Sequence, residues 1–212
     1  MHSDQISQYL IYGHIATGAI ALMVGAIALL AKKGSWLHKR CGKVFLYSMT
    51  ASALVSMVVA MLPGHESAFL LGIAVMSLYF IISGYRSLRY KHKNPNLTFD
   101  KIISIIIIVT GFVMVVLPIL QSGKLNVVLF VFGILSMVFG ISDFKNYKDL
   151  KALKKKYLQL HLSKITGGYI SAVSAFFVVN QILPGIWNWF TPGVLGAIFI
   201  VYWSRKVERK KG

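Results

Sequence analysis

Seven uncharged, mostly apolar runs divide this chain and leave it few ways to fold. A bilayer core of about 30 Å is crossed by roughly 20 helical residues, each rising about 1.5 Å. An isolated strand of the same composition would leave its backbone groups unsatisfied in hydrocarbon, so each run predicts a membrane-spanning helix. The expected spans are residues 6–31, 44–62, 68–85, 102–119, 125–142, 165–183 and 189–203.

The composition supports the same interpretation. Apolar residues make up 56% of the 212-residue chain and charged residues 14%, whereas soluble domains carry about 25% charged residues. A soluble protein with buried helices would need polar faces of comparable area, and the sequence has none. We therefore expect an all-α polytopic membrane protein in which residues 1–212 form a single transmembrane domain, a seven-helix bundle. Glycines within the runs, among them Gly25, Gly133 and Gly140, predict close packing between helices.

The basic residues predict the orientation of the bundle. All 23 lysines and arginines except Lys124 fall within alternate loops and the C-terminal tail, at residues 32–43, 86–101, 145–164 and 205–211. Because cytoplasmic loops collect basic residues, we expect the N-terminus outside and the C-terminus in the cytoplasm, in a bacterial-type cytoplasmic (inner) membrane. A net charge of +17 often indicates a nucleic-acid partner. Because the basic residues are confined to one side of the membrane, the positive charge indicates orientation, and we expect no nucleic-acid partner.

One charged segment, residues 143–164, is long enough to form structure outside the spans. Between its lysines, apolar residues recur at helical steps of three or four. Such a stripe predicts an amphipathic helix lying on anionic lipids of the inner leaflet, although a solvated linker is the alternative. The apolar positions are Tyr147, Leu150, Leu153, Tyr157 and Leu160.

Few ionisable side chains fall within or beside the spans, and each is costly enough there to suggest a function. His14 lies roughly 10 Å inside the first span. His38, Asp143 and His161 lie next to three different spans near the cytoplasmic boundary, as Asp100 does next to a fourth. Helices of one bundle can bring these separate segments together.

Three arrangements of these residues stay open. Paired imidazoles at one depth would ligate haem b, with His38 and His161 inside and His14 with His65 outside, so the cofactor-binding candidates are His14, His38 and His161. Alternatively, His38, Asp143 and His161 would hold a divalent metal such as zinc, whose open position would permit hydrolysis. In the third arrangement, His14 is a packing or proton-handling residue and the others anchor the interface.

Several short motifs resemble a family of predicted membrane proteins. They are His14-Ile-Ala-Thr-Gly18, His38-Lys-Arg-Cys-Gly42, Ser83-Gly84-Tyr85-Arg86, Gly168-Tyr169-Ile170 and Leu183-Pro184-Gly185. With Asp143 and His161, they make the chain similar to domain-of-unknown-function family 2306 over nearly its whole length. Lys164-Ile165 replaces the Arg-Met pair typical of such sequences. The resemblance implies a multi-span fold and draws attention to the histidines and Asp143, but it implies no reaction.

Common catalytic motifs are missing from the sequence. It has no Gly-rich phosphate loop, no His-Glu-x-x-His, no Cys-x-x-Cys and no Gly-x-Ser-x-Gly motif. From the histidines and Asp143 beside the spans, we expect a haem- or metal-binding redox membrane protein. The alternatives are a carrier, scaffold or assembly factor without catalytic activity, and a zinc-dependent membrane hydrolase.

Overall fold

A computed structural model describes residues 2–209, which form seven α-helices, one short 3₁₀-helix and, within that range, no strand. The all-α prediction is confirmed for this part of the chain. The helices are α1 (His2–Leu30), α2 (Trp36–Val59), α3 (Ala68–Arg86), η1 (Ser87–Lys91), α4 (Thr98–Ser122), α5 (Val127–Tyr147), α6 (Leu150–Asn180) and α7 (Trp187–Arg209).

Six of the described helices, α1 to α6, are long and apolar enough to cross a membrane. Their length and composition are those of a helical integral membrane protein. The helix that contains the seventh expected span, α7, is not among the six. Its first two turns contain Asn188, Thr191 and Pro192, and its last two turns carry four charged residues, which together shorten its apolar part.

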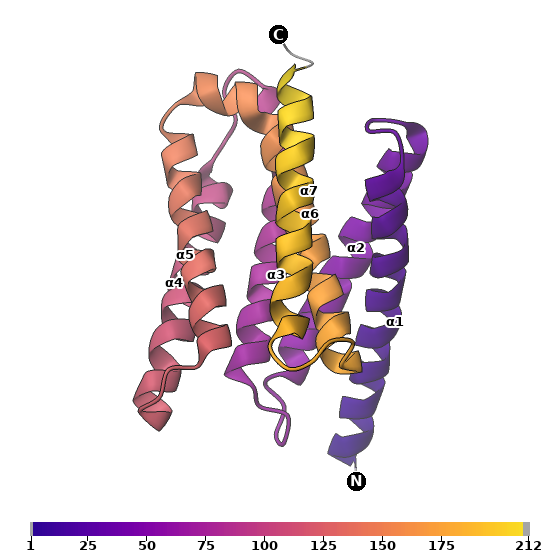
Figure 1. The fold of residues 1–212 in the computed structure, drawn as a ribbon, viewed down its shortest axis with the longest axis vertical. Coiled ribbons are helices and arrows are strands. Elements are labelled where there is room, and N and C mark those ends of the chain that lie inside the picture. Colours follow the sequence, from indigo (N-terminus) through magenta and orange to yellow (C-terminus); the bar gives the residue numbers. More distant parts are fainter. Residues whose placement is uncertain (1, 210–212) are drawn as a thin grey trace.

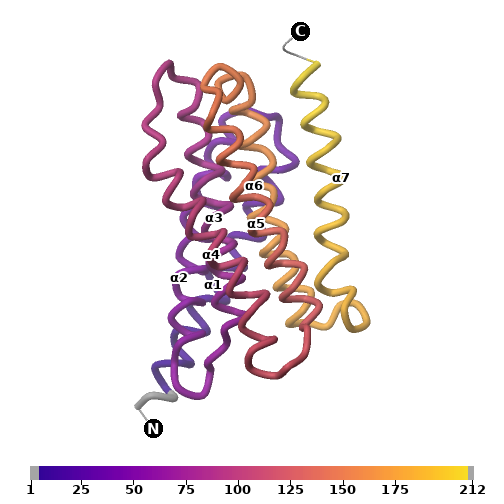
Figure 2. The backbone as a smooth tube through the Cα atoms, turned by 90° about the vertical axis from the view of Figure 1, so that its left-hand side faces the viewer, coloured from indigo at the N-terminus to yellow at the C-terminus, as the bar shows by residue number. Residues whose placement is uncertain are grey.

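Successive helices run in opposite directions, so the loops gather at two ends of an elongated bundle (Figure 1). The loops after α1, η1 and α5 share one end with the C-terminal part of α7. We call this the basic end, because it carries the lysine- and arginine-rich loops. The N-terminal end of α1 lies at the opposite end, with the loops that precede α3, α5 and α7. The helix α3 packs against α2, α4 and α6, while α7 runs beside α6 along one side (Figure 2).

Polar side chains fix where several helices begin. Ser35, Ser67 and Asn126 each accept a hydrogen bond from the first turn of the helix that follows. Asp149 does the same for α6, since its carboxylate accepts from the backbone N–H groups of Lys151 and Ala152 at 2.9 and 3.0 Å. These two donors stabilise the charged form, which lowers the pKa of Asp149 below its ordinary value.

The charged segment 143–164 differs from the expected surface helix. Its first residues end α5, and the rest form the first half of α6, which continues as one helix to Asn180. Most of the apolar stripe faces protein: Tyr147 and Leu153 are buried in one cluster with Tyr90 of η1, and Tyr157 and Leu160 pack against it. Leu150 of the stripe is 43% exposed. The lysines on the other side of α6 stay exposed. The stripe therefore fixes α6 to the bundle.

Glycines allow close helix packing, as the sequence predicts. A Cβ atom added to Gly25 would lie 2.6 Å from the Tyr169 ring. The closest backbone approach joins α4 and α5, where Gly111 and Gly133 face each other. A Cβ atom on Gly111 would lie 2.5 Å from the carbonyl oxygen of Gly133, and one on Gly133 would lie 2.7 Å from that of Gly111. Contacts of this kind let helices associate in lipid without a hydrophobic driving force.

Candidate functional site

A buried ion pair joins α5 and α6 inside the bundle. The Lys164 Nζ atom lies 2.6 Å from Oδ2 of Asp143, and the two side chains are 7% and 4% exposed. The same oxygen accepts a hydrogen bond of 2.7 Å from the hydroxyl of Tyr79 in α3. The Lys164 ammonium also lies 4.9 Å from the centre of the Tyr79 ring, within cation–π distance. Three helices thus converge on one pair of charges.

A second ion pair lies between α3 and the start of α4. Arg86 donates two hydrogen bonds to the carboxylate of Asp100, from Nε at 2.9 Å and from Nη2 at 2.6 Å. The hydroxyl of Tyr90 adds a third at 2.9 Å. Asp100 is 1% exposed, whereas the side chain of Arg86 is 17% exposed and stacks on the Phe99 ring. A two-pronged arginine contact of this kind fixes the geometry as well as the charge.

Hydroxyl groups connect the two ion pairs into one network. The Ser104 Oγ atom lies 3.1 Å from Oδ2 of Asp143 and 2.9 Å from the backbone carbonyl oxygen of Asp100. It is also 3.4 Å from the hydroxyl of Tyr147, whose ring packs edge-on against that of Tyr90. The network therefore contains two acids, two bases and hydroxyls between them. Such a set can hold charge inside the bundle, because each charged group has a partner.

Two histidines of the basic end each form a hydrogen bond with a carbonyl oxygen in the last turn of another helix. His38 at the start of α2 has its Nδ1 atom 2.9 Å from the carbonyl oxygen of Ala28 in α1. His161 in α6 has its Nδ1 atom 2.8 Å from the carbonyl oxygen of Gly84 in α3. A carbonyl oxygen only accepts, so Nδ1 carries the hydrogen and Nε2 of the neutral ring keeps its lone pair. His38 and His161 are close enough to interact electrostatically.

A lysine supports the same helix end as His38. Lys33 donates from Nζ to the carbonyl oxygen of Leu29 at 2.5 Å. Its ammonium also lies 5.0 Å from the ring centre of Trp203 in α7. Partial burial in this contact lowers the pKa of Lys33. The loop between α1 and α2 is thereby connected to α7, next to the histidines.

His14 lies in a contact between α1 and α2. Its Nδ1 atom lies 2.9 Å from the carbonyl oxygen of Ser52 and 3.0 Å from the Ser52 hydroxyl. That hydroxyl also lies 3.2 Å from the carbonyl oxygen of His14. Gly18 lies one turn further along α1 and leaves room for Ser52. This arrangement agrees with the packing role that was one of the alternatives, and His65 lies exposed in the loop before α3.

The metal set expected from the sequence does not come together. Among residues 2–209, no group of three or more His, Cys, Asp or Glu side chains is placed to hold a metal ion. In the predicted set, Asp143 is bound by Lys164 and Tyr79 instead of joining His38 and His161. The two histidines that the haem arrangement requires lie at the same end of the bundle, each bonded to a carbonyl oxygen of another helix.

Several residues of the network escape sequence reasoning. In the sequence, Lys164 is one basic residue of a loop and a departure from the Arg-Met pair of the family. Tyr79 lies inside an expected span, and Tyr147 belongs to the apolar stripe, so neither indicates a charged site. One signal was present: Asp143 directly follows an apolar run, and an acid in that position needs a cation nearby. The sequence does not say which of the many lysines supplies it.

Comparison with known proteins adds no relative. No family model, no curated protein and no solved structure matches the chain. The resemblance to domain-of-unknown-function family 2306 therefore stays a prediction, and the site is interpreted from its own geometry.

Proposed function

We propose that the chain crosses a bacterial-type cytoplasmic membrane seven times, with the N-terminus outside and the basic end in the cytoplasm. Two observations support α7 as the seventh span. It runs beside α6 along the bundle (Figure 2), and Val194, Leu195, Ile198 and Val201 on it are between 49% and 63% exposed. An exposed apolar stripe of this size would promote aggregation in water, whereas lipid chains can cover it.

Cysteine labelling tests this topology. In a Cys41→Ser background, Glu66→Cys and Ile182→Cys should react with a membrane-impermeant maleimide added to intact cells. Lys93→Cys and Glu208→Cys should react only after the membrane is opened. Labelling of Glu208→Cys from outside would contradict α7 as a span, because residues 182 and 208 would then lie on one side.

We infer further that the protein binds haem b through the Nε2 atoms of His38 and His161. The observation that carries this proposal is that two histidines at the same end of the bundle have their Nδ1 atoms held by carbonyl oxygens of other helices. Ligating histidines characteristically donate their other ring nitrogen to such an acceptor, which fixes the tautomer and the ring orientation. Haem, when bound, supplies an iron that gains and loses one electron. His38 of α2 and His161 of α6 would hold it, at the cytoplasmic side of the proposed topology.

An absorption spectrum tests the haem proposal. Protein made with haem supplied and purified in detergent should show a Soret band that shifts on reduction with dithionite. His38→Asn and His161→Asn should each abolish the low-spin spectrum. The asparagine amide can still donate to the carbonyl oxygen that Nδ1 serves, so the helix end is retained while the ligand is lost.

Two controls separate ligation from folding. His92→Ala changes an exposed histidine of the same end and should leave the spectrum unchanged. Both asparagine variants should elute from a sizing column as the unchanged protein does. A wild-type protein without a Soret band would overturn the haem proposal. A carrier or scaffold without a cofactor is then the better function, since the Nδ1 contacts alone explain both histidines as helix-capping residues.

A further inference from the structure

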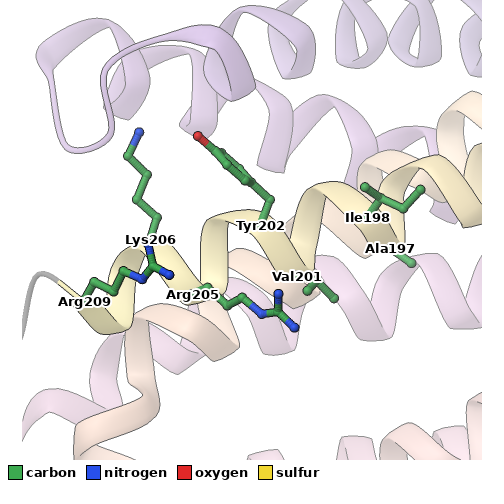
Figure 3. Close-up of a pocket in the computed structure, with 7 residues that line it drawn as sticks. All are labelled: Ala197, Ile198, Val201, Tyr202, Arg205, Lys206 and Arg209. Carbon is green, nitrogen blue, oxygen red and sulfur yellow. The ribbon is translucent and has the colours of Figure 1, made fainter.

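An open groove of about 700 Å³ follows the C-terminal half of α7. The lining changes character along the helix. Ile198, Val201 and Tyr202 form the apolar part, and Arg205, Lys206 and Arg209 form the basic part. Figure 3 shows Tyr202 and Lys206 projecting from α7 toward the loop between α1 and α2.

The order of apolar and basic residues matches a lipid leaflet. About 16 Å separates residue 198 from residue 209 along the helix axis, and the basic residues lie toward the end of the bundle that carries the basic loops. Ile198 and Tyr202 are 63% and 59% exposed, so a neighbouring hydrocarbon chain can cover them. A chain lying on these residues would bring its headgroup to the three cations.

The basic part is suited to a phosphate. Two arginines can each offer paired N–H donors to phosphate oxygens. The Lys206 ammonium is held 4.7 Å from the ring centre of Trp203. Among the described residues that line the groove, none is acidic. The nearest acid along the helix, Glu208, accepts a hydrogen bond from Gln159 of α6 instead.

A second groove, of about 900 Å³, lies on the α6 side of the same helix end. It is lined by Lys151, Lys154 and Lys155 of α6, with Val207 and Glu208 of α7. These lysines add to the positive potential at the end of α7, which attracts anionic headgroups.

We propose that the groove along α7 binds one anionic phospholipid of the cytoplasmic leaflet. Its acyl chain lies on Ile198, Val201 and Tyr202, and its phosphate is held by Arg205, Lys206 and Arg209. The site rests on the proposed membrane placement of α7 and is independent of haem binding. The cysteine labelling above tests that placement separately, so a wrong topology and an absent lipid site give different results.

Lipid-dependent stabilisation tests the site. Detergent-purified protein is titrated with phosphatidylglycerol, and the increase in its thermal unfolding temperature gives the apparent affinity. A triple variant, Arg205→Gln, Lys206→Gln and Arg209→Gln, should bind phosphatidylglycerol about 100-fold more weakly, since each basic residue near an anionic surface contributes about a factor of five. Phosphatidylcholine, which has no net charge, should stabilise the two proteins equally and less strongly.

A matched variant and a soluble headgroup complete the design. Lys91→Gln, Lys93→Gln and Lys101→Gln remove the same charge from exposed positions of the same end and should keep the phosphatidylglycerol effect. Glycerol phosphate without acyl chains should give no comparable shift. The proposed site would be wrong if the α7 triple variant bound phosphatidylglycerol as tightly as the wild-type protein. It would also be wrong if the matched variant lost as much affinity as the α7 triple variant. A shift with glycerol phosphate as large as that with phosphatidylglycerol would assign the site to a soluble phosphate.

Should the α7 triple variant fail to fold, the single variants Arg205→Gln and Arg209→Gln should each weaken phosphatidylglycerol binding about fivefold.

Discussion

Replacing Asp143 by asparagine should destabilise the protein by about 3–5 kcal/mol, because the change leaves the Lys164 ammonium buried without a counter-charge. Asparagine has nearly the same shape, and its side-chain oxygen can still accept from the Tyr79 hydroxyl that now bonds Asp143. The loss therefore reports the missing negative charge and not a cavity. It should appear as a lower unfolding temperature and a smaller free energy of unfolding in detergent. Lys164→Met should cost a similar amount, since it leaves Asp143 unpaired.

The double variant decides whether the pair acts as a unit. Asp143→Asn combined with Lys164→Met buries no charge, so its loss should be well below the sum of the two single losses. Asp149→Asn is the control, because it removes an acidic charge from an exposed residue and keeps a side chain that can cap α6. The Asp149→Asn variant should unfold at nearly the same temperature as the wild-type protein. Additive losses in the double variant, or an unchanged unfolding temperature for Asp143→Asn, would contradict this account of the network.

The fold could be predicted from the sequence as far as it depends on composition. Apolar runs of sufficient length must be helical in hydrocarbon, and each of the seven predicted spans lies mostly within one of the seven helices. The start of α6 could not be predicted in this way. Its first half carries the lysines of residues 151–164, which resemble a loop or surface segment. The stripe from Tyr147 to Leu160 predicted one surface helix, whereas α5 ends at Tyr147 and α6 begins at Leu150. Periodicity alone cannot say whether protein or lipid covers such a stripe.

The candidate site was less accessible to sequence reasoning, because it depends on contacts between distant helices. His38, Asp143 and His161 were singled out by their positions beside spans, and all three have specific partners. Those partners differ from the predicted set. Asp143 is paired with Lys164, 21 positions further along the chain, and each histidine bonds a backbone carbonyl oxygen of another helix, which no residue type encodes.

Replacing Gly111 by alanine should destabilise the α4–α5 pair by about 1–3 kcal/mol, because the new methyl group meets the backbone of the facing helix. Its Cβ atom would lie 2.5 Å from the carbonyl oxygen of Gly133 and 2.9 Å from the Met137 side chain. A carbonyl oxygen cannot rotate away as a side chain can, so the two helices must separate. The separation should also reduce the hydrogen-exchange protection of the loop between α4 and α5.

A second glycine substitution supplies the control with the opposite sign. A Cβ atom on Gly42 in α2 would meet nothing within 4 Å. Gly42→Ala should therefore raise stability by about 0.5–1 kcal/mol, because alanine loses less backbone entropy in a helix. Both variants add one methyl group to a helical glycine, and both can be followed by thermal unfolding in the same detergent. If both variants raise stability, helix propensity and not the contact with Gly133 governs Gly111, and the close approach of α4 and α5 is not needed for stability.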